Sequence, residues 1–286
     1  MTNEGWANAA EATYIVASHA QSLGVTFYTK EITSLLYSPL FPTRCIGVQS
    51  FSEKYLADKV VLCTGFGTPP LLDLPIALTP KGHCLAHMQL TPLEAARYHT
   101  MPVYISNKYS MYLFPPFSNG VMRIAALSTR YTACKPRLQS QFPDDGIPFE
   151  AEEHLRMGLR EVIPSLADKE IFDVRVCWCV DTPEMDFLVT EVTDREGIYV
   201  ATGGSGHGFK FLPVIGRYIA LMLEGKLSSE MTEKWRWKTP GSDAQDIQCW
   251  GWQSRKGYIL EGKRFENTDG WTNSAKHGVM RHTWDN

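Results

Sequence analysis

Apolar and polar positions follow two different periods along the first part of the chain. Between Gly5 and Gly24, small and apolar residues return at helical spacing, and Gly24 suits the position just after a helix. The residues with this spacing are Ala9, Ala12, Ile15 or Val16, His19 and Leu23. Residues 25–28 are β-prone, and 59–64 is a short apolar run before a glycine turn. The pattern predicts a helix over 5–24 and a buried parallel strand over 59–64.

The pattern changes to short β-prone runs between residues 82 and 128, with turn residues between them. Such runs are typical of an antiparallel sheet. Residues 149–163 then carry Leu155, Leu159 and Val162 at helical spacing, and Pro164 follows. We expect an amphipathic helix there, because a proline at that point ends a helix.

Three further β-prone runs lie at 171–180, 187–192 and 197–202. The last of them leads directly into a glycine-rich stretch, and residues 211–224 follow as a predicted helix that ends at Gly225. Because predicted helices alternate with a parallel strand and with strands of an antiparallel sheet, the sequence predicts a mixed α/β fold. From about residue 239 the chain is polar and shows no strong period.

Composition narrows the possible functions. The chain has 286 residues, of which 44% are hydrophobic, and its formal net charge is −3. Without an excess of Lys and Arg we do not expect nucleic-acid binding, and no apolar run is long enough to span a membrane. The first residues lack a signal-peptide pattern, and the last ones are not a peroxisomal SKL-type address. Seven scattered cysteines favour a reduced, intracellular protein, cytoplasmic or peroxisomal.

The segment Gly203-Gly-Ser-Gly-His-Gly208 lies between a predicted strand and a predicted helix. That geometry presents backbone N–H groups and a positive helix end to an anion or an electron-rich ring. The segment matches neither GxGxxG, since position 209 is Phe, nor a P-loop. A tight turn without a ligand is the alternative. Lys210 favours the ligand interpretation, because it places a cation where a substrate carboxylate or a reduced cofactor would need one.

Cys177 and Cys179 are separated by one residue, so a strand would turn both thiols to the same face. No second cysteine pair lies at zinc spacing, and two buried strand cysteines are the default interpretation. His83 and His87 are four residues apart in a β-prone run without the Glu of HExxH, so we interpret them as structural. No GxSxG or Cys–His signature indicates a hydrolase.

Several specific segments together resemble one enzyme family. They are Cys177-Trp-Cys-Val-Asp-Thr-Pro183, Gly197–Gly216 with SGHGFKF at its centre, Trp235-Arg-Trp237, Gly5-Trp-Ala-Asn-Ala9, Lys59–Gly65 and His87-Met-Gln-Leu-Thr-Pro92. Over about residues 3–240, the chain resembles fungal fructosyl amino acid oxidases. These enzymes belong to the sarcosine-oxidase branch of the FAD-dependent amine oxidases.

The resemblance implies a flavoprotein with FAD bound covalently through Cys177, because a thiolate is a strong nucleophile toward an activated flavin methyl group. It implies that Cys179 faces the substrate and that Lys210 is an active-site cation for the substrate carboxylate. The loop residues implied to bind the flavin are Gly204, Ser205, Gly206, His207, Gly208, Phe209 and Lys210. The implied reaction removes hydride from a C–N bond of a secondary or N-substituted amino acid, and O2 then reoxidises the flavin to give H2O2.

The chain departs from the family pattern in two ways. GxGxxG, which opens the family's dinucleotide-binding βαβ unit, occurs nowhere in the sequence, so we expect the chain to begin after that unit and to hold FAD less tightly. Arg123, within Gly120–Ile124, stands where the family carries a lysine that assists the reaction with O2. Arginine keeps the positive charge but is larger, planar and never neutral. A dehydrogenase-like role, or oxidation coupled to cyclisation in alkaloid synthesis, is therefore an alternative to reaction with O2.

These implications define an expected organisation, in which an incomplete FAD-binding Rossmann-like domain is interleaved with an antiparallel substrate domain. The FAD-binding domain would hold residues 1–82 and 177–240, the substrate domain 83–176 and a C-terminal extension 241–286. Expected substrates are a fructosyl amino acid, a sarcosine-like amine or an alkaloid precursor, the last in fungal specialised metabolism. A truncated, non-catalytic remnant or a binding protein unable to hold FAD is the alternative.

Overall fold

The computed structural model describes residues 6–72, 78–106, 108–109, 111–126, 131–132, 146–238, 258–259 and 271–272. The described residues belong to two compact units, one within residues 1–79 and 179–247 and the other within 80–178 and 248–286. Each unit has its own core of buried apolar side chains. Both units combine helices with sheets, which confirms the predicted mixed α/β fold.

The first unit opens with α1 (Ala9–Ser22), which confirms the helix predicted over 5–24 with shorter ends. The Asn8 side chain accepts a hydrogen bond from the backbone N–H of Glu11 and so caps the first turn. Gly24 follows the helix with φ of +95°, a conformation that favours glycine. None of the 14 residues of α1 is buried within the described structure.

An antiparallel sheet that the sequence pattern did not predict follows α1. In this sheet β1 (Ile32–Tyr37) pairs with β2 (Cys45–Ser50), and β2 pairs with β3 (Lys54–Leu56). The β-prone residues 25–28 precede it and lie in no strand. Val25, Phe27 and Tyr28 are all exposed, so they lack the half-buried surface on which β-propensity depends.

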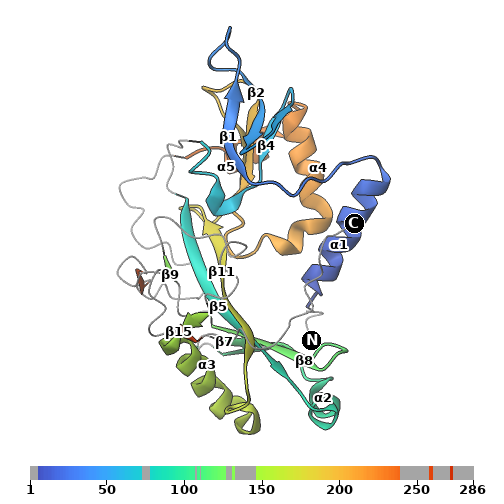
Figure 1. The fold of residues 1–286 in the computed structure, drawn as a ribbon, viewed down its shortest axis with the longest axis vertical. Helices are drawn as coiled ribbons and strands as arrows, with labels where there is room; N and C mark the ends of the chain where they lie inside the picture. Colours follow the sequence, from blue (N-terminus) through green and yellow to red (C-terminus); the bar gives the residue numbers. More distant parts are fainter. Residues whose placement is uncertain are drawn as a thin grey trace. The chain divides into compact units, whose positions relative to one another are not determined.

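A second sheet of this unit has the order β12–β13–β4 among the described residues. β13 (Ile198–Thr202) pairs antiparallel with β12 (Leu188–Glu191) and parallel with β4 (Val60–Leu62). Since Val60 and Leu62 are buried, the parallel strand predicted over 59–64 is confirmed. α4 (Leu212–Leu223) and α5 (Ser229–Trp235) pack beside this sheet against β12 (Figure 1).

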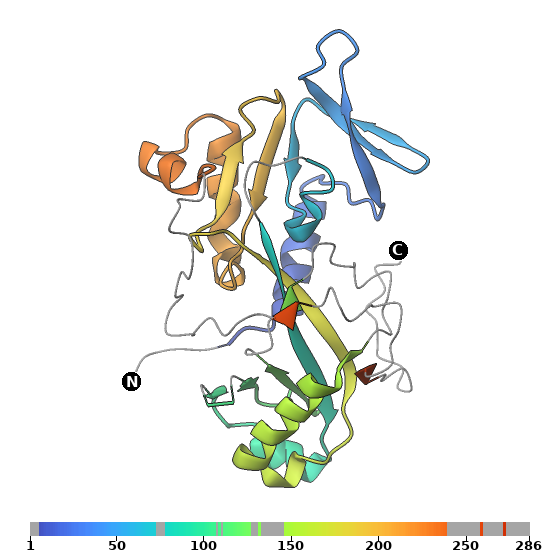
Figure 2. The ribbon, with the colours of Figure 1, turned by 90° about the vertical axis from the view of Figure 1, so that its left-hand side faces the viewer.

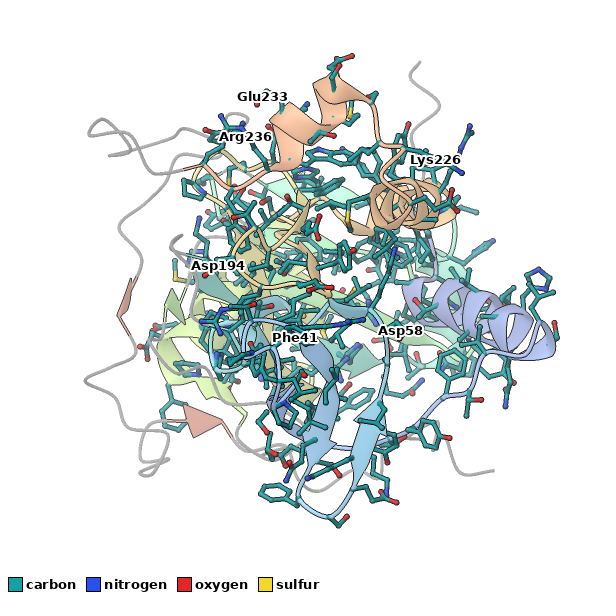
Figure 3. All side chains as sticks on the ribbon, turned by 90° about the horizontal axis from the view of Figure 1, so that it is seen from above. Phe41, Asp58, Asp194, Lys226, Glu233 and Arg236 are labelled. Atoms are coloured by element: carbon teal, nitrogen blue, oxygen red, sulfur yellow. The ribbon has the colours of Figure 1, made fainter. Side chains whose placement is uncertain are left out.

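An ion pair with two hydrogen bonds lies at the end of α5. Arg236 donates from Nε to Glu233 Oε2 at 2.7 Å and from Nη2 to Glu233 Oε1 at 2.8 Å, and both residues are labelled in Figure 3. The hydrogen bonds from Arg236 hold the pKa of the Glu233 carboxyl below its usual value. Because both groups are exposed, the pair contributes little to stability.

The second unit is built on a larger sheet. Among the described residues its order is β14–β9–β5–β8–β7–β6, and β11 also pairs with β5. The strands are β5 (Thr79–Gln89), β6 (Tyr104–Ser106), β7 (Met111–Leu113), β8 (Val121–Ala126), β9 (Tyr131–Thr132), β11 (Phe172–Asp181) and β14 (Tyr258–Ile259). The neighbours β5–β8, β8–β7 and β7–β6 are antiparallel, which confirms the antiparallel sheet predicted over 82–128.

One face of this sheet is covered by α3 (Phe149–Val162), the helix predicted over 149–163 (Figure 2). Leu155 and Leu159 of α3 are fully buried with Met88, Met111 and Ile124 of the strands. The strand β10 (Ile147–Pro148), just before α3, pairs with β15 (Trp271–Thr272).

A short helix, α2 (Pro92–Tyr98), follows β5 and was not predicted. Its first turn is closed by a capping box, in which Thr91 Oγ1 accepts from the Glu94 N–H and the Glu94 carboxylate accepts from the Thr91 N–H. The sequence Thr-Pro-Leu-Glu is a known signature of such a start. Within the described part of the chain, no helix combines the length and the apolar character needed to cross a membrane.

Candidate functional site

The glycine-rich segment forms a tight loop between β13 and a turn of 3-10 helix, η3 (Phe209–Phe211), which leads into α4. Gly203, Ser205 and Gly206 have φ values of +69°, +48° and +73°. Glycine adopts this region freely, whereas a residue with a Cβ is disfavoured there. Ser205 therefore needs contacts that compensate for its strained backbone.

Hydrogen bonds from both its backbone and its side chain hold Ser205 in place. The Ser205 N–H donates to the Val180 carbonyl at 2.9 Å, and its hydroxyl donates to the Gly203 carbonyl at 3.0 Å. The hydroxyl also accepts from the Thr182 N–H at 3.3 Å. Ser205 is only 3% exposed. These bonds tie the loop to the end of β11, so its conformation is set by the protein itself.

Gly206 and Gly208 are needed for different reasons. A Cβ at Gly208 would lie 3.2 Å from the Gly204 Cα, so glycine lets the loop close on itself. A Cβ at Gly206 would meet nothing within 4 Å, and the Gly206 N–H makes no backbone hydrogen bond to a described residue. The loop thus presents backbone to open space at Gly206. That arrangement fits an anion or the carbonyl edge of an electron-rich ring.

The side chains of His207, in the loop, and Lys210, just after it, differ in how firmly they are held. His207 Nδ1 lies 2.8 Å from the Ser205 carbonyl oxygen, and its ring stacks on Phe187 with centroids 5.2 Å apart. Lys210, in η3, is exposed, and its Nζ lies 5.5 Å from the centre of the Phe211 ring. It forms no ion pair with any carboxylate that the structure describes. Its charge is therefore available to an external anion.

A second group of candidate residues lies in the other unit, on strands β5, β8 and β11. His87 and Arg123 are direct partners across β5 and β8. Their strand neighbours Met88 and Met122 are fully buried in the core beneath α3. Since side chains alternate between faces along a strand, His87 and Arg123 lie on the opposite face of the sheet.

His87 joins Arg123 to β11. The Arg123 Nε–H donates to His87 Nε2 at 3.1 Å, and His87 Nδ1 lies 3.2 Å from Asp173 Oδ2. The other carboxylate oxygen of Asp173 lies 3.6 Å from Arg175 Nη1. A connected set of charged and polar groups thus crosses three strands.

Burial sets the charge state of this cluster. It lowers the pKa of His87 from 6.5 to about 4, and the positive charges of Arg123 and Arg175 act in the same direction while Asp173 opposes them. Burial also lowers the pKa of Arg123, with the charge of Arg175 as a further cause. At pH 7 the imidazole is neutral, and Arg123 remains charged.

Cys177 is exposed on β11, two residues beyond Arg175. The interpretation of two buried strand cysteines is therefore wrong for Cys177, whereas Cys179 is half-buried. Val174 and Val176 of β11 are buried in the core of this unit, so Cys177 lies on the opposite face of the strand, the face that carries His87 and Arg123.

The structure places Cys177 on the same face of the sheet as Arg123, and it joins Arg123 to His87, which the sequence suggested to be structural. It adds Asp173, which sequence reasoning missed. The buried residues Met88 and Met122 form part of an alternating pattern that could have placed His87 and Arg123 on the other face of their strands. The pairing of β5 with β8, which makes them neighbours, is a tertiary feature that no local pattern contains.

The sequence pattern of the FAD dependent oxidoreductase family, DAO, matches residues 1–222, and the chain belongs to this family. This confirms the resemblance to FAD-dependent amine oxidases.

Individual relatives make the likeness more specific. The chain is 31% identical over 257 residues to L-saccharopine oxidase of Schizosaccharomyces pombe, a match that covers 82% of this chain and 59% of the relative. It is 26% identical over 211 residues to monomeric sarcosine oxidase of Bacillus sp. (strain NS-129), over 70% of this chain and 53% of that one. The solved structure of fructosyl peptide oxidase from E. terrenum is similar, with a TM-score of 0.81 and 32% identity over 95% of this chain and 64% of that one. The chain thus spans less than two thirds of the length of each of these proteins.

Proposed function

We propose that the protein acts in the FAD-dependent oxidation of a C–N bond in a secondary or N-substituted amino acid. The observation that carries this proposal is the exposed thiol of Cys177, which lies on the same face of the sheet as Arg123, away from α3. Membership of the FAD dependent oxidoreductase family supports it. Oxidases of saccharopine, sarcosine and fructosyl peptides among the similar proteins support the substrate class.

The residues that would hold FAD are Cys177 and the loop from Gly204 to Lys210. Cys177 would form a thioether to a methyl group of the flavin ring; the thiol and the methyl group would each lose a proton, and the flavin would take up the two electrons and pass them to O2. The loop residues Gly204, Ser205, Gly206, His207, Gly208 and Phe209 would supply backbone N–H groups to its carbonyl edge. When bound, FAD supplies the two-electron acceptor for hydride removal from the carbon next to the amine nitrogen.

Lys210, Cys179 and Arg123 are assigned the remaining roles. Lys210 would pair with the substrate carboxylate, because its ammonium group is exposed and meets no described carboxylate. Cys179 would face the substrate. Arg123 would assist the reaction with O2, which takes up two electrons and two protons to give H2O2. The imine left by hydride removal then adds water or cyclises.

A fructosyl amino acid, a sarcosine-like amine and an alkaloid precursor all fit a site with a cation for the carboxylate. An intracellular location, with alkaloid synthesis as one setting, stays a prediction from the sequence. The alternative of a non-catalytic remnant or a binding protein is not favoured by the relatives, which are oxidases.

Visible absorption of the purified 286-residue chain, before and after acid precipitation, tests the proposal. Yellow colour that stays with the precipitate shows covalent flavin, and Cys177→Ser should release it while Cys179→Ser retains it. Colour that moves to the supernatant would reject the thioether but keep the flavin. A colourless protein that takes up no added FAD would reject the proposed function.

A further inference from the structure

His87 stands between a guanidinium and a carboxylate, with only 5% of its surface exposed. Arg123 Nε lies 3.1 Å from His87 Nε2, and Asp173 Oδ2 lies 3.2 Å from His87 Nδ1. The Asp173 main-chain oxygen lies 3.3 Å from the same Nδ1, and the Phe172 ring lies 5.8 Å from the imidazole. The imidazole is therefore held at both of its nitrogens.

The chemistry of the two partners decides which nitrogen carries the proton. A guanidinium N–H can only donate, so His87 Nε2 must accept and carries no hydrogen. In the neutral ring the proton is then on Nδ1, where both oxygens of Asp173 within reach are acceptors. Asp173 thus selects the tautomer that Arg123 requires.

Burial keeps the ring neutral, and the neighbouring arginines add to this effect. The groups that act on His87 or Arg123 are Asp173, Arg175 and Cys177 from β11 and Tyr112 from β7, besides their mutual interaction. A proton added to His87 would place a third positive charge beside two arginines, with a single carboxylate to oppose it. Burial is the main cause that lowers the pKa of His87 to about 4, and the two arginines act in the same direction while Asp173 opposes them.

Among the described residues, the hydrogen bond that restrains Arg123 is made at its Nε. Its Nε is engaged by His87, and its Cζ lies 5.6 Å from the centre of the Phe117 ring. Its terminal amino groups form no ion pair with any carboxylate that the structure describes. They remain able to donate hydrogen bonds to another group.

We propose that His87 is a positioning residue: in the tautomer set by Asp173, it holds the Arg123 guanidinium so that its terminal amino groups are presented to an anionic or electron-rich ligand. The geometry of this relay is independent of any cofactor. Its consequence for the flavin and O2 rests on the proposed function.

Asp173→Asn is the variant best suited to test the relay. Asp173 has φ of +44°, and asparagine tolerates this conformation as well as aspartate does, so the backbone should persist. An amide that keeps its oxygen toward Arg175 would turn its NH2 group toward His87 Nδ1. The imidazole proton would then move to Nε2 and oppose the Arg123 Nε–H.

Nitrogen-15 NMR of histidine- and arginine-labelled protein, without flavin, measures which nitrogen of His87 carries the proton and how fast the Arg123 Nε–H exchanges. We expect wild-type His87 to be protonated on Nδ1 alone and not to titrate between pH 5 and 8. In Asp173→Asn we expect a protonated Nε2 population and faster exchange of the Arg123 Nε–H with water, on the order of tenfold. His99→Gln, at an exposed site after α2, should change neither signal. Wild-type protonation on Nε2, or titration near pH 6.5, would overturn the proposal.

In flavin-loaded protein, reoxidation by O2 gives the second readout. It should slow on the order of tenfold in Asp173→Asn and in His87→Phe, and less in His87→Gln, whose amide oxygen can still accept from Arg123. Equal rates in all variants, with the NMR result as expected, would overturn the presentation of Arg123 to the flavin while the tautomer relay stands. If the protein binds no flavin, the proposed function fails and the NMR result alone decides the relay.

Discussion

Gly158 of α3 lies directly against Met111 of β7: a Cβ at Gly158 would stand 1.9 Å from Met111 Sδ. Glycine in a helix normally costs about 1 kcal/mol relative to alanine. Here the absence of a side chain lets the helix approach a fully buried strand residue. Glycine is therefore required at position 158 for the packing of α3 in the second unit.

Replacing Gly158 with alanine should destabilise the protein. Overpacking costs typically 1–3 kcal/mol, which outweighs the gain in helix propensity and leaves a net loss of about 1 kcal/mol. Urea unfolding of wild type and variant measures this difference in the free energy of unfolding. Gly216→Ala in α4 is the matched control, because a Cβ there meets nothing within 4 Å, and it should stabilise the protein slightly. A Gly158→Ala variant as stable as Gly216→Ala would show that Met111 yields freely.

Ser205 should tolerate glycine better than alanine. Both replacements lose the hydroxyl bonds to Gly203 and Thr182. Alanine also keeps the strained positive φ, which costs roughly 1–2 kcal/mol for a residue with a Cβ, whereas glycine does not. Thermal unfolding should rank Ser205→Gly above Ser205→Ala by about 1 kcal/mol. The reverse order would mean that the strain at this position is negligible.

Protonation of His87 should make the folded state less stable in mild acid. Its folded pKa of about 4 lies below its usual 6.5, so the unfolded chain binds more protons between these values. The contribution of the neutral ring is fully present above pH 6.5 and is lost as pH falls toward 4, by about 3 kcal/mol at most.

Urea unfolding at several pH values between 7 and 4 isolates this contribution. His87→Gln should show a shallower loss of stability over that window, because the titrating ring is gone. His99→Gln should keep the wild-type profile. Parallel profiles for wild type and His87→Gln would mean that His87 has nearly the same pKa in the folded and unfolded states.

For the reoxidation of reduced flavin by O2, a positive charge at position 123 should matter more than the shape of the side chain that carries it. Under the proposed function, Arg123→Lys keeps a cation, so reoxidation of reduced flavin by O2 should change only severalfold, whereas Arg123→Met should slow it about a hundredfold. Stopped-flow absorption at the oxidised flavin band measures both rates. An Arg123→Met variant with the wild-type rate would remove Arg123 from the oxygen reaction.

Local patterns predicted the elements that local physics determines. The apolar spacing of Leu155 and Leu159 found α3, and the buried run around Val60 found the parallel strand β4. The sheet β1–β2–β3 was missed, because its strands are stabilised by pairing rather than by a clear alternation. The helix α2 was missed, although Thr91 and Glu94 have the spacing of the capping box that begins it.

The candidate site likewise has one part that the sequence could predict and one part that it could not. The loop around Ser205 is contiguous in sequence, so its glycines could be recognised directly. The cluster of His87, Arg123 and Asp173 is assembled from three strands, and only their pairing makes the three side chains neighbours. A histidine that seems structural in its own segment becomes part of a charged network once those strands meet.

The helix α1 buries no side chain in the described structure, and Tyr14, Ile15 and Val16 are more than 45% exposed. An isolated helix of its 14 residues is marginal in water, because tertiary packing provides most helical stability in proteins. The backbone amides of α1 should therefore exchange with deuterium sooner than those of α3, a helix of the same length with four buried residues. Local opening would then begin at α1 before it reaches the buried helix α3.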